Sequence, residues 1–461
     1  MPPLTQFTPP YPVRVKDWPN PHLIMVGKRS RDAAYGWPEQ AFEVAYKERR
    51  LLGTTVHMVN DPDFIGHVML HNHENYVKPD FLQLVLKPAI GRGLFLAEQG
   101  LWRTQRKIVA PTFAPSSLTS LNDRIARVAV GQMADWPATT ICLDIAEQAN
   151  ATALAVISDA LFSGDTRLTS PVATAQLQAV LSDVGRPYLS VMFGLPGFSL
   201  SPSFWRSKRG QKFLRHAIGE MVDERVVQGR YDDFFGGLIR ALFDQFPQNE
   251  ARALAIDNAL TIYVAGHETT SVALAWTSYL LAAQPALQEL ARAEAIAALV
   301  GDPATLPERL PLLRQIIEES MRLYPPLYRL ERQALAQDRF GAVTIKKGDI
   351  ISIWPMVVHR HRALWERPDV FDHTRFAPVG KAAQHRFQYI PFGVGPRICV
   401  GARMAMAEAL IVMAHWLAAR RFDLAKGHAV RPIAGVTLRP AGGMPLMVSP
   451  LEPAAAAVRR L

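Results

Sequence analysis

The segment Phe392–Gly401 (FGVGPRICVG) holds one of only two cysteines in this 461-residue chain and precedes an apolar run with a helical pattern. Glycines let the backbone wrap closely around the sulfur of Cys399 and point N–H groups at it, which favours the thiolate. The thiolate is the form of cysteine that binds metals. Arg397 is placed to contact a carboxylate of a flat cofactor bidentately. The segment therefore predicts a loop that presents a sulfur ligand to iron.

The spacing Phe-x-x-Gly-x-Arg-x-Cys-x-Gly is long and specific, and it resembles the haem-binding loop of the cytochrome P450 family. The resemblance makes Cys399 the axial ligand of the haem iron. It also implies that Phe392, Gly393, Arg397 and Gly401 hold the cofactor. The alternative is a buried structural cysteine in a glycine-containing turn, which is the usual fate of a lone intracellular cysteine.

Residues 261–281 are apolar around the whole circumference of a helix, so we expect a helix that crosses the core. Gly266 inside such a helix costs about 1 kcal/mol relative to alanine, and Glu268 is expensive to bury without a partner. The hydroxyl of Thr269 or Thr270 can bond a carbonyl one turn back and open a gap beside Gly266. A small ligand and a water would fit in that gap.

This helix resembles the oxygen-binding helix of the family, whose signature Ala-Gly-x-Glu-Thr-Thr stands at Ala265–Thr270. The resemblance implies that Thr269 holds a proton-delivering water and that Glu268 relays protons to it. It also places Ala265 and Gly266 against the haem. A core polar cluster with no catalytic role is the alternative.

The segment Ile316–Pro326 predicts a helix that ends before two prolines and carries Glu319 and Arg322 on one face. Pairs with this spacing are usually solvated and worth on the order of a few tenths of a kcal/mol. The resemblance instead assigns them, together with Arg375, to the structural Glu-Arg-Arg brace of the family. The two residues before Arg375 are His-Thr where the family usually has Pro-Glu.

Trp102 and Arg106 are four residues apart and fall together on one face of a predicted helix. An indole N–H and a guanidinium suit a carboxylate. In the family, residues that match this pair and Arg332 hold the haem propionates. Without the other motifs, Trp102 would be a core residue and the arginines a solvated face.

The motifs occur in the order of the family, which makes their joint interpretation stronger than any single one. The resemblance implies a mainly α (α+β) architecture, the cytochrome P450 fold, with small β-sheets and haem b between the oxygen-binding helix and the helix after the cysteine loop. We expect one domain over residues 1–461, with a Pro-rich segment at 1–40 and a low-complexity tail at 451–461. Local patterns predict a strand at Thr54–Val59 leading into a helix capped by Asp61.

Two cysteines argue against a disulfide scaffold and fit a reducing cytoplasm. We expect Cys142 to be a buried apolar residue. The Pro-dense N-terminus has no apolar run typical of a signal peptide or membrane anchor, so we expect neither, and we expect no fused electron-transfer module. The resemblance then points to a cytoplasmic, monomeric enzyme of bacterial type. Its electrons would come indirectly from NAD(P)H through another protein.

The formal net charge is +10 and the isoelectric point is near 9.7. No nucleic-acid motif accompanies this charge, so we expect no nucleic-acid partner. Arg103, Lys107, Arg397 and Arg403 lie on segments that the family places around the thiolate side of the haem. A basic patch there would suit an acidic ferredoxin or flavodoxin, served by its own reductase. A generally basic surface is the alternative.

The resemblance implies a haem-thiolate monooxygenase that inserts one atom of O2 into an apolar molecule. A haem-thiolate isomerase or dehydratase and a non-catalytic haem sensor are the alternatives, and the intact Glu268-Thr269 pair argues against both. Terpenoids, fatty acyl chains, steroids and small aromatics all suit the expected substrate pocket. By position, this pocket is formed by Phe81, Leu94, Phe95, Tyr188, Phe193, Leu327, Tyr328, Leu330 and Val436.

Overall fold

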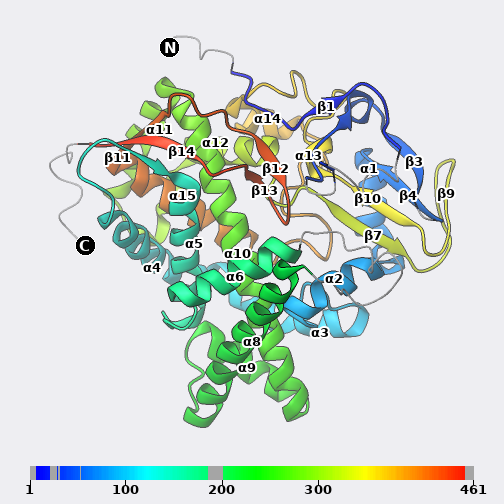
Figure 1. Cartoon of the computed structure of the whole chain (residues 1–461), viewed down its shortest axis with the longest axis horizontal. Coiled ribbons are helices and arrows are strands. Elements are labelled where there is room, and N and C mark those ends of the chain that lie inside the picture. The colour runs from blue at the N-terminus through cyan, green and yellow to red at the C-terminus, as the bar shows by residue number, and fades with distance from the viewer. Residues whose placement is uncertain (1–6, 21–27, 30–31, 52, 185–200, 452–461) are drawn as a thin grey trace.

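The computed structural model describes residues 7–20, 28–29, 32–51, 53–184 and 201–451. Helices fill the left and centre of Figure 1, and most strands lie toward the periphery. This arrangement confirms the predicted mainly α architecture with small β-sheets.

The described helices are α1 (Pro62–Gly66), α2 (Asp80–Ile90), α3 (Gln99–Val109), α4 (Pro115–Ala134), α5 (Ile145–Phe162), α6 (Pro171–Val184), α8 (Pro202–Gln228), α9 (Phe234–Gln245), α10 (Gln248–Ala282), α11 (Pro285–Leu299), α12 (Pro311–Leu323), α13 (Pro355–Val358), α14 (Pro378–Ala382) and α15 (Ala402–Ala419). The described strands are β1 (Arg14–Val15), β2 (Trp37–Pro38), β3 (Tyr46–Leu51), β4 (Thr54–Val59), β5 (Tyr76–Val77), β6 (Ile141–Asp144), β7 (Leu330–Ala334), β8 (Asp338–Phe340), β9 (Val343–Ile345), β10 (Ile350–Ile353), β11 (Arg420–Leu424), β12 (Pro432–Ala434), β13 (Leu438–Pro440) and β14 (Pro445–Pro450).

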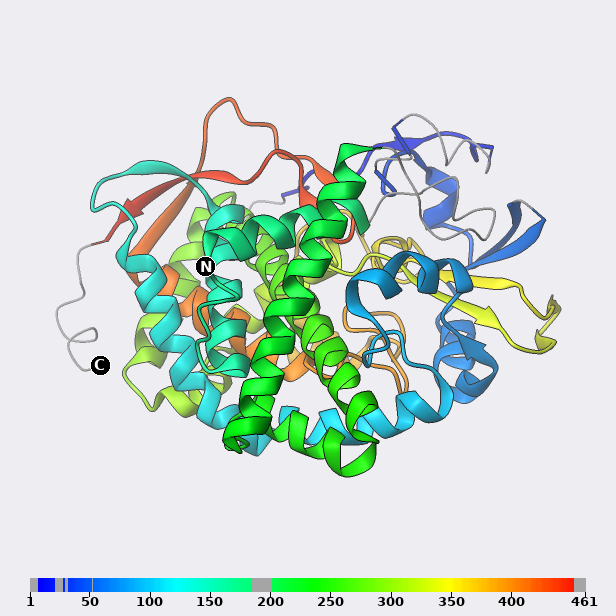
Figure 2. The same cartoon turned by 60° about the horizontal axis from the view of Figure 1, so that its bottom comes forward.

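The largest sheet has the strand order β3-β4-β10-β7-β5 and lies on the right in Figures 1 and 2. β4 and β10 pair in parallel, and the other neighbours pair antiparallel. β4 is the strand predicted at Thr54–Val59. The Asp61 carboxylate then caps α1 by accepting the backbone N–H groups of Asp63 and Phe64 at 2.8 and 3.0 Å, as the sequence predicts.

The central helix α10 is 35 residues long and begins well before the predicted position 261. The indole of Trp276 on this helix stacks on Tyr324 with ring centres 3.7 Å apart. Its N–H donates to the carbonyl of Leu438 at 2.8 Å. These contacts fix α10 against the end of α12 and against β13, so the helix has a defined position beside the cysteine segment.

One helix among the described residues, α15, is long and apolar enough to cross a membrane. Most of it, 72%, is buried inside the protein, as expected for a core helix. It follows the cysteine loop directly and packs against α4 and α11.

A Cβ atom on Gly266 would lie 2.5 Å from the side chain of Ile157, so this glycine allows α5 to approach α10 closely. One local expectation is wrong: Cys142 is exposed instead of buried. It lies on β6, an edge strand of the sheet β11-β14-β6, where one flank of the strand has no neighbouring strand to cover it.

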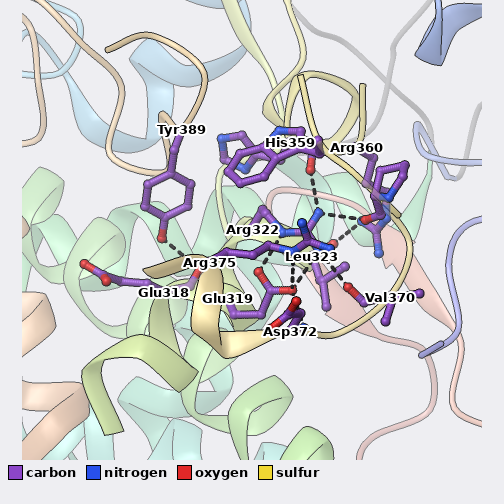
Figure 3. Close-up of polar contacts among 12 residues, drawn as sticks. Glu318, Glu319, Arg322, Leu323, His359, Arg360, Val370, Asp372, Arg375 and Tyr389 are labelled. Atoms are coloured by element: carbon purple, nitrogen blue, oxygen red, sulfur yellow. Dashed lines mark hydrogen bonds and ion pairs between the residues drawn. The ribbon is translucent and has the colours of Figure 1, made fainter. Parts of the chain in front are cut away.

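The buried pair Glu319–Arg322 joins α12 to the chain that leads to the cysteine loop (Figure 3). Arg322 Nε and Nη2 donate to the Glu319 carboxylate at 2.6 and 2.8 Å. The remaining donors of Arg322 bond the carbonyls of His359, Pro368 and Val370 at 2.8, 2.7 and 3.1 Å. Both side chains are fully shielded from solvent, so this is not the solvated pair that the spacing alone suggests.

Arg375 completes the group, with its Nε 3.7 Å from Glu319 Oε1 (Figure 3). The same carboxylate oxygen accepts the backbone N–H of Asp372 at 2.8 Å. The structure therefore brings together all three residues of the expected brace, although the Pro-Glu of the family pattern is absent before Arg375.

A second buried arginine, Arg360, belongs to no motif in the sequence. It donates to the carbonyl of Leu323, and its Nε lies 3.2 Å from Asp369. Asp369 also accepts from both terminal nitrogens of Arg14, at 2.9 and 2.6 Å. Burial lowers the pKa of Arg360 to about 10. These contacts tie the N-terminal segment to the same region as the brace.

Glu319→Gln should lower the free energy of unfolding by about 3 kcal/mol or more, because it leaves the buried Arg322 charge without its counter-ion. Urea unfolding followed by circular dichroism measures the change. Asp223→Asn is the control, since Asp223 pairs with Arg252 at 2.7 Å with both side chains exposed. It should cost about 1 kcal/mol at most. Equal losses in the two variants would contradict the prediction.

Candidate active site

A cavity of about 930 Å³ lies between α10 and the cysteine segment and extends to the five-stranded sheet. Every described residue predicted to bind the cofactor, to catalyse or to contact substrate lines it. The lining includes Phe81, Leu94, Phe95, Trp102, Arg106, Ala265, Gly266, Glu268, Thr269, Leu327, Tyr328, Leu330, Arg332, Phe392, Gly393, Arg397, Cys399, Gly401 and Val436. Tyr188 and Phe193 lie outside the described residues.

The cysteine loop is held by its own backbone and by a close contact with the chain near α1. The N–H of Cys399 donates to the carbonyl of Phe392 at 2.9 Å. Gly395 has a φ of 74°, and a Cβ atom there would lie 1.9 Å from the carbonyl oxygen of Met69. Any other residue at 395 would push the loop away from this neighbour, so Gly395 sets the position of the sulfur. Gly395 is the first glycine of the Phe-x-x-Gly-x-Arg-x-Cys-x-Gly pattern.

The Cys399 thiol opens onto the cavity but is surrounded by protein on its other sides. Burial raises the pKa of this thiol, while the Gly401 N–H and the charge of Arg106 oppose the shift. We expected the loop itself to favour the thiolate, but burial is the larger effect. A metal ion that coordinates a thiol deprotonates it outright. Arg106 also donates to the Ile398 carbonyl at 3.0 Å, which ties α3 to the loop.

Three cations converge on one carboxylate at the cavity wall. Arg397 forms an ion pair with Glu98, and its guanidinium lies 4.6 Å from the ring centre of Trp102. Lys78 Nζ lies 3.8 Å from the same carboxylate. Burial lowers the pKa of Lys78 well below its usual range, with further lowering from Arg332 and Arg397. Burial, followed by the charge of Arg397, lowers the pKa of Arg332 to about 10.

This wall fits haem. The guanidinium groups of Arg332 and Arg397, with Lys78 beside them, face a single acid, Glu98, so the buried charge is positive and suits the two propionates of a haem. The Cys399 sulfur opens into the same cavity, as an axial ligand requires. Lys78 and Glu98 belong to no recognisable motif, and only the fold shows that they belong to this site.

The two threonines of α10 both bond back along the helix. Thr269 Oγ1 donates to the Ala265 carbonyl at 2.8 Å, and Thr270 Oγ1 donates to the Gly266 carbonyl at 3.1 Å. The sequence predicts such a hydroxyl-to-carbonyl bond for either Thr269 or Thr270. Because the Thr269 proton is engaged with the helix, its oxygen is left as an acceptor at the cavity surface.

Glu268 is anchored by a residue that no motif indicates. Its Oε1 accepts from the Thr437 hydroxyl at 2.9 Å, and Thr437 lines the same cavity. Its Oε2 is buried and has no hydrogen-bond partner among the described residues. Burial raises the pKa of Glu268, while the Thr437 bond and the charge of Arg439 act in the opposite direction. One oxygen is therefore fixed and the other is free to exchange a proton.

A family model and several known proteins match most of this chain. The family model described as "Cytochrome P450" matches residues 48–444. Cytochrome P450 714C3 of Oryza sativa subsp. japonica is 30% identical over 418 residues, which cover 85% of this chain and 79% of the relative. Cyclooctatin synthase of Streptomyces melanosporofaciens is 27% identical over 413 residues, with coverages of 88% and 87%. A cytokinin hydroxylase of Arabidopsis thaliana is 28% identical over 433 residues, with coverages of 88% and 80%.

Solved structures show the same fold. The retinoic acid-bound cyanobacterial CYP120A1 superposes with a TM-score of 0.78 at 21% identity and covers 96% of this chain and 100% of that chain. The cytochrome P450DA heme domain superposes with a TM-score of 0.76, also at 21% identity, with coverages of 89% and 90%.

The fold and these matches define a haem-thiolate protein, and the chain belongs to the cytochrome P450 family. It is a cytochrome P450 monooxygenase, an oxidoreductase of the kind that uses haem, O2 and electrons derived from NAD(P)H. The predicted family and fold are thus confirmed.

Proposed function

We propose that this enzyme inserts one atom of O2 into an apolar organic molecule, with electrons from a separate acidic ferredoxin or flavodoxin. The observation that carries the proposal is that one cavity joins the Cys399 sulfur, the Glu268–Thr269 pair and an apolar wall. A mostly apolar wall with few polar groups is typical of sites for apolar ligands. Terpenoid, fatty acyl, steroid and aromatic skeletons all remain within the proposal.

In this proposal each group at the cavity has a separate task. Bound haem b supplies oxygen and one-electron chemistry at its iron, with Cys399 as the thiolate ligand that favours O–O cleavage. Lys78, Arg332 and Arg397 hold the propionates, and Arg106 with Trp102 supports this wall. Phe392 and Gly401 shape the pocket around the sulfur.

Protons reach the reacting oxygen through Thr269 and Glu268. The Thr269 oxygen, whose own proton is bonded to the helix, accepts a hydrogen bond from a water and so holds that water in the cavity. Glu268 has a raised pKa because it is buried, so its free oxygen Oε2 can carry a proton and pass it to this water. Thr437 keeps the carboxyl in place while the proton moves.

A cytoplasmic, monomeric enzyme of bacterial type is part of this proposal; the low cysteine content of the chain fits the reducing compartment that it names. A haem-thiolate isomerase or a haem sensor has no need of a proton relay to oxygen. The Glu268–Thr437 bond and the position of Thr269 therefore favour oxygen activation over both alternatives.

The first test concerns ligation. Cys399→Ser should abolish the red-shifted absorption band of the reduced carbonyl complex, because that band requires a thiolate opposite the carbon monoxide. Cys142→Ser should retain the band, since Cys142 lies exposed on β6. A band that persists in the Cys399 variant would contradict the assignment.

The second test concerns the proton relay. Thr269→Ala should bind haem and substrate normally but lower the yield of oxidised product per NAD(P)H by about 10- to 100-fold, with peroxide formed instead. Thr277→Ala is the control, because Thr277 makes the same bond to its helix, to Ala273 at 2.7 Å, but does not line the cavity. Unchanged coupling in the Thr269 variant would remove this residue from the mechanism.

The third test concerns the redox partner. Lys107 on α3 and Arg403 on α15 are exposed on elements that flank Cys399, and their charge should attract an acidic partner. Lys107→Glu and Arg403→Glu should slow reduction at low salt, and the difference should fade as the Debye length shortens to ~10 Å at 0.1 M. Stopped-flow reduction measures the rates.

Arg103 is a less direct probe than Lys107 or Arg403, because it pairs with Glu74 at 2.5 Å. Lys426→Glu, a change of equal charge on an exposed loop before β12, is the control and should leave the rate unchanged. Rates that depend on neither salt nor these charges would rule out electrostatic docking at this face.

A further inference from the structure

The cavity reaches one face of the five-stranded sheet, and this face carries an arginine. Arg49 on the edge strand β3 lies opposite Val56 of β4, and Val56 lies opposite Ile350 of β10. All three line the cavity. Successive side chains of a strand point to opposite faces, so the next residue, Arg50, is directed away and is exposed. In Figure 1 this sheet lies to the right of α10 and α15.

Arg29 lines the cavity beside Arg49, and both are half-buried. Burial lowers the pKa of Arg29, and the charge of Arg49 lowers it further. Arg49 donates to the Pro19 carbonyl and lies 5.3 Å from the ring centre of Trp18. Within the described part of the chain, neither guanidinium has a carboxylate within ion-pair distance. Two positive charges therefore repel each other at a shielded position without a counter-ion.

Arg329 lines the same cavity but has a carboxylate partner, unlike Arg29 and Arg49. Its Nε lies 3.6 Å from Glu331 Oε1, and its guanidinium lies 5.4 Å from the ring centre of Trp354. Both members of this pair line the cavity, so their charges cancel there. Of these three arginines, Arg29 and Arg49 are thus the two without a counter-ion among the described residues.

We propose that Arg29 and Arg49 bind the carboxylate of an apolar acid whose body extends along the cavity toward Cys399. A guanidinium matches a carboxylate in two parallel hydrogen bonds. A carboxylate would also remove the repulsion between the two arginines, which otherwise costs stability. This substrate class rests on the proposed function, because the apolar body must reach the oxygen-activating side of the cavity.

A carboxylate suits the site better than a phosphate monoester. The indole of Trp18 lies 5.3 Å from the Arg49 guanidinium, and the indoles of Trp37 and Trp354 line the same cavity, so the surroundings offer apolar surface. A phosphate monoester carries about −1.5 to −2 charges at neutral pH and is more costly to remove from water than a monoanion.

Isothermal titration of the haem-loaded enzyme with matched ligand pairs tests the proposal. The pairs are dodecanoate with dodecan-1-ol, hexadecanoate with hexadecan-1-ol, and all-trans-retinoate with retinol. In at least one pair the acid should bind about 10- to 100-fold more tightly than the alcohol, the range expected for hydrogen bonds to a charged group. Arg49→Gln and Arg29→Gln should each reduce this preference, whereas Arg50→Gln, which makes the same charge change on the opposite face, should preserve it.

Absence of an acid preference in all three pairs, or a preference that survives both Arg49→Gln and Arg29→Gln, would overturn the proposal. Tighter binding of dodecyl phosphate than of dodecanoate would also overturn it and would assign the site to phosphate. The thiolate band of the carbonyl complex and product formation report separately on the proposed function. Absence of an acid preference in the unmodified enzyme, with an intact band and intact turnover of a neutral substrate, counts against the carboxylate site alone. An acid preference without oxidised product counts against the monooxygenase proposal alone.

Discussion

A guanidinium sealed from water, that of Arg322, fixes how the haem end of the molecule is assembled. All five of its N–H groups are used, two by Glu319 and three by carbonyls of the segment between α13 and the cysteine loop. The free-energy cost of removing such an ion pair from water is offset only when every hydrogen-bond partner is in place. The position of this segment relative to α12 is therefore well defined, and the placement of the Cys399 loop depends on it.

The cavity has an apolar wall with charge confined to separate places on its border. Cations face the expected propionates, one anchored carboxyl, Glu268, projects from α10, and a further pair of arginines consists of Arg49 on the sheet and Arg29 beside it. Because the Coulomb energy falls with distance, each group acts most strongly on what lies next to it. Binding of the cofactor, proton delivery and substrate orientation can then rest on different residues of the same cavity.

The sequence predicted those parts of the site whose chemistry requires fixed local spacing. The cysteine loop, the signature on α10 and the Trp102–Arg106 pair are of this kind, and the structure places them around one cavity. Lys78, Glu98 and Thr437 were missed because each is a single residue brought to the site by tertiary folding. The close approach of α5 at Gly266 was missed for the same reason: Ile157 lies more than 100 positions away on α5, so no local pattern could show this contact.

The parallel pairing of β4 with β10 joins Val56 to Ile350, which emerges from the ribosome about 300 residues later. At a synthesis rate of about 5 to 20 residues per second, β4 waits roughly 15 to 60 s for this neighbour. During that interval its apolar side chains and one row of its backbone donors lack their final cover. The nascent chain can therefore form non-native strand pairs until well over half of it has been synthesised. The yield of folded protein in a cell should depend on how well these strands are kept from pairing with other chains during synthesis.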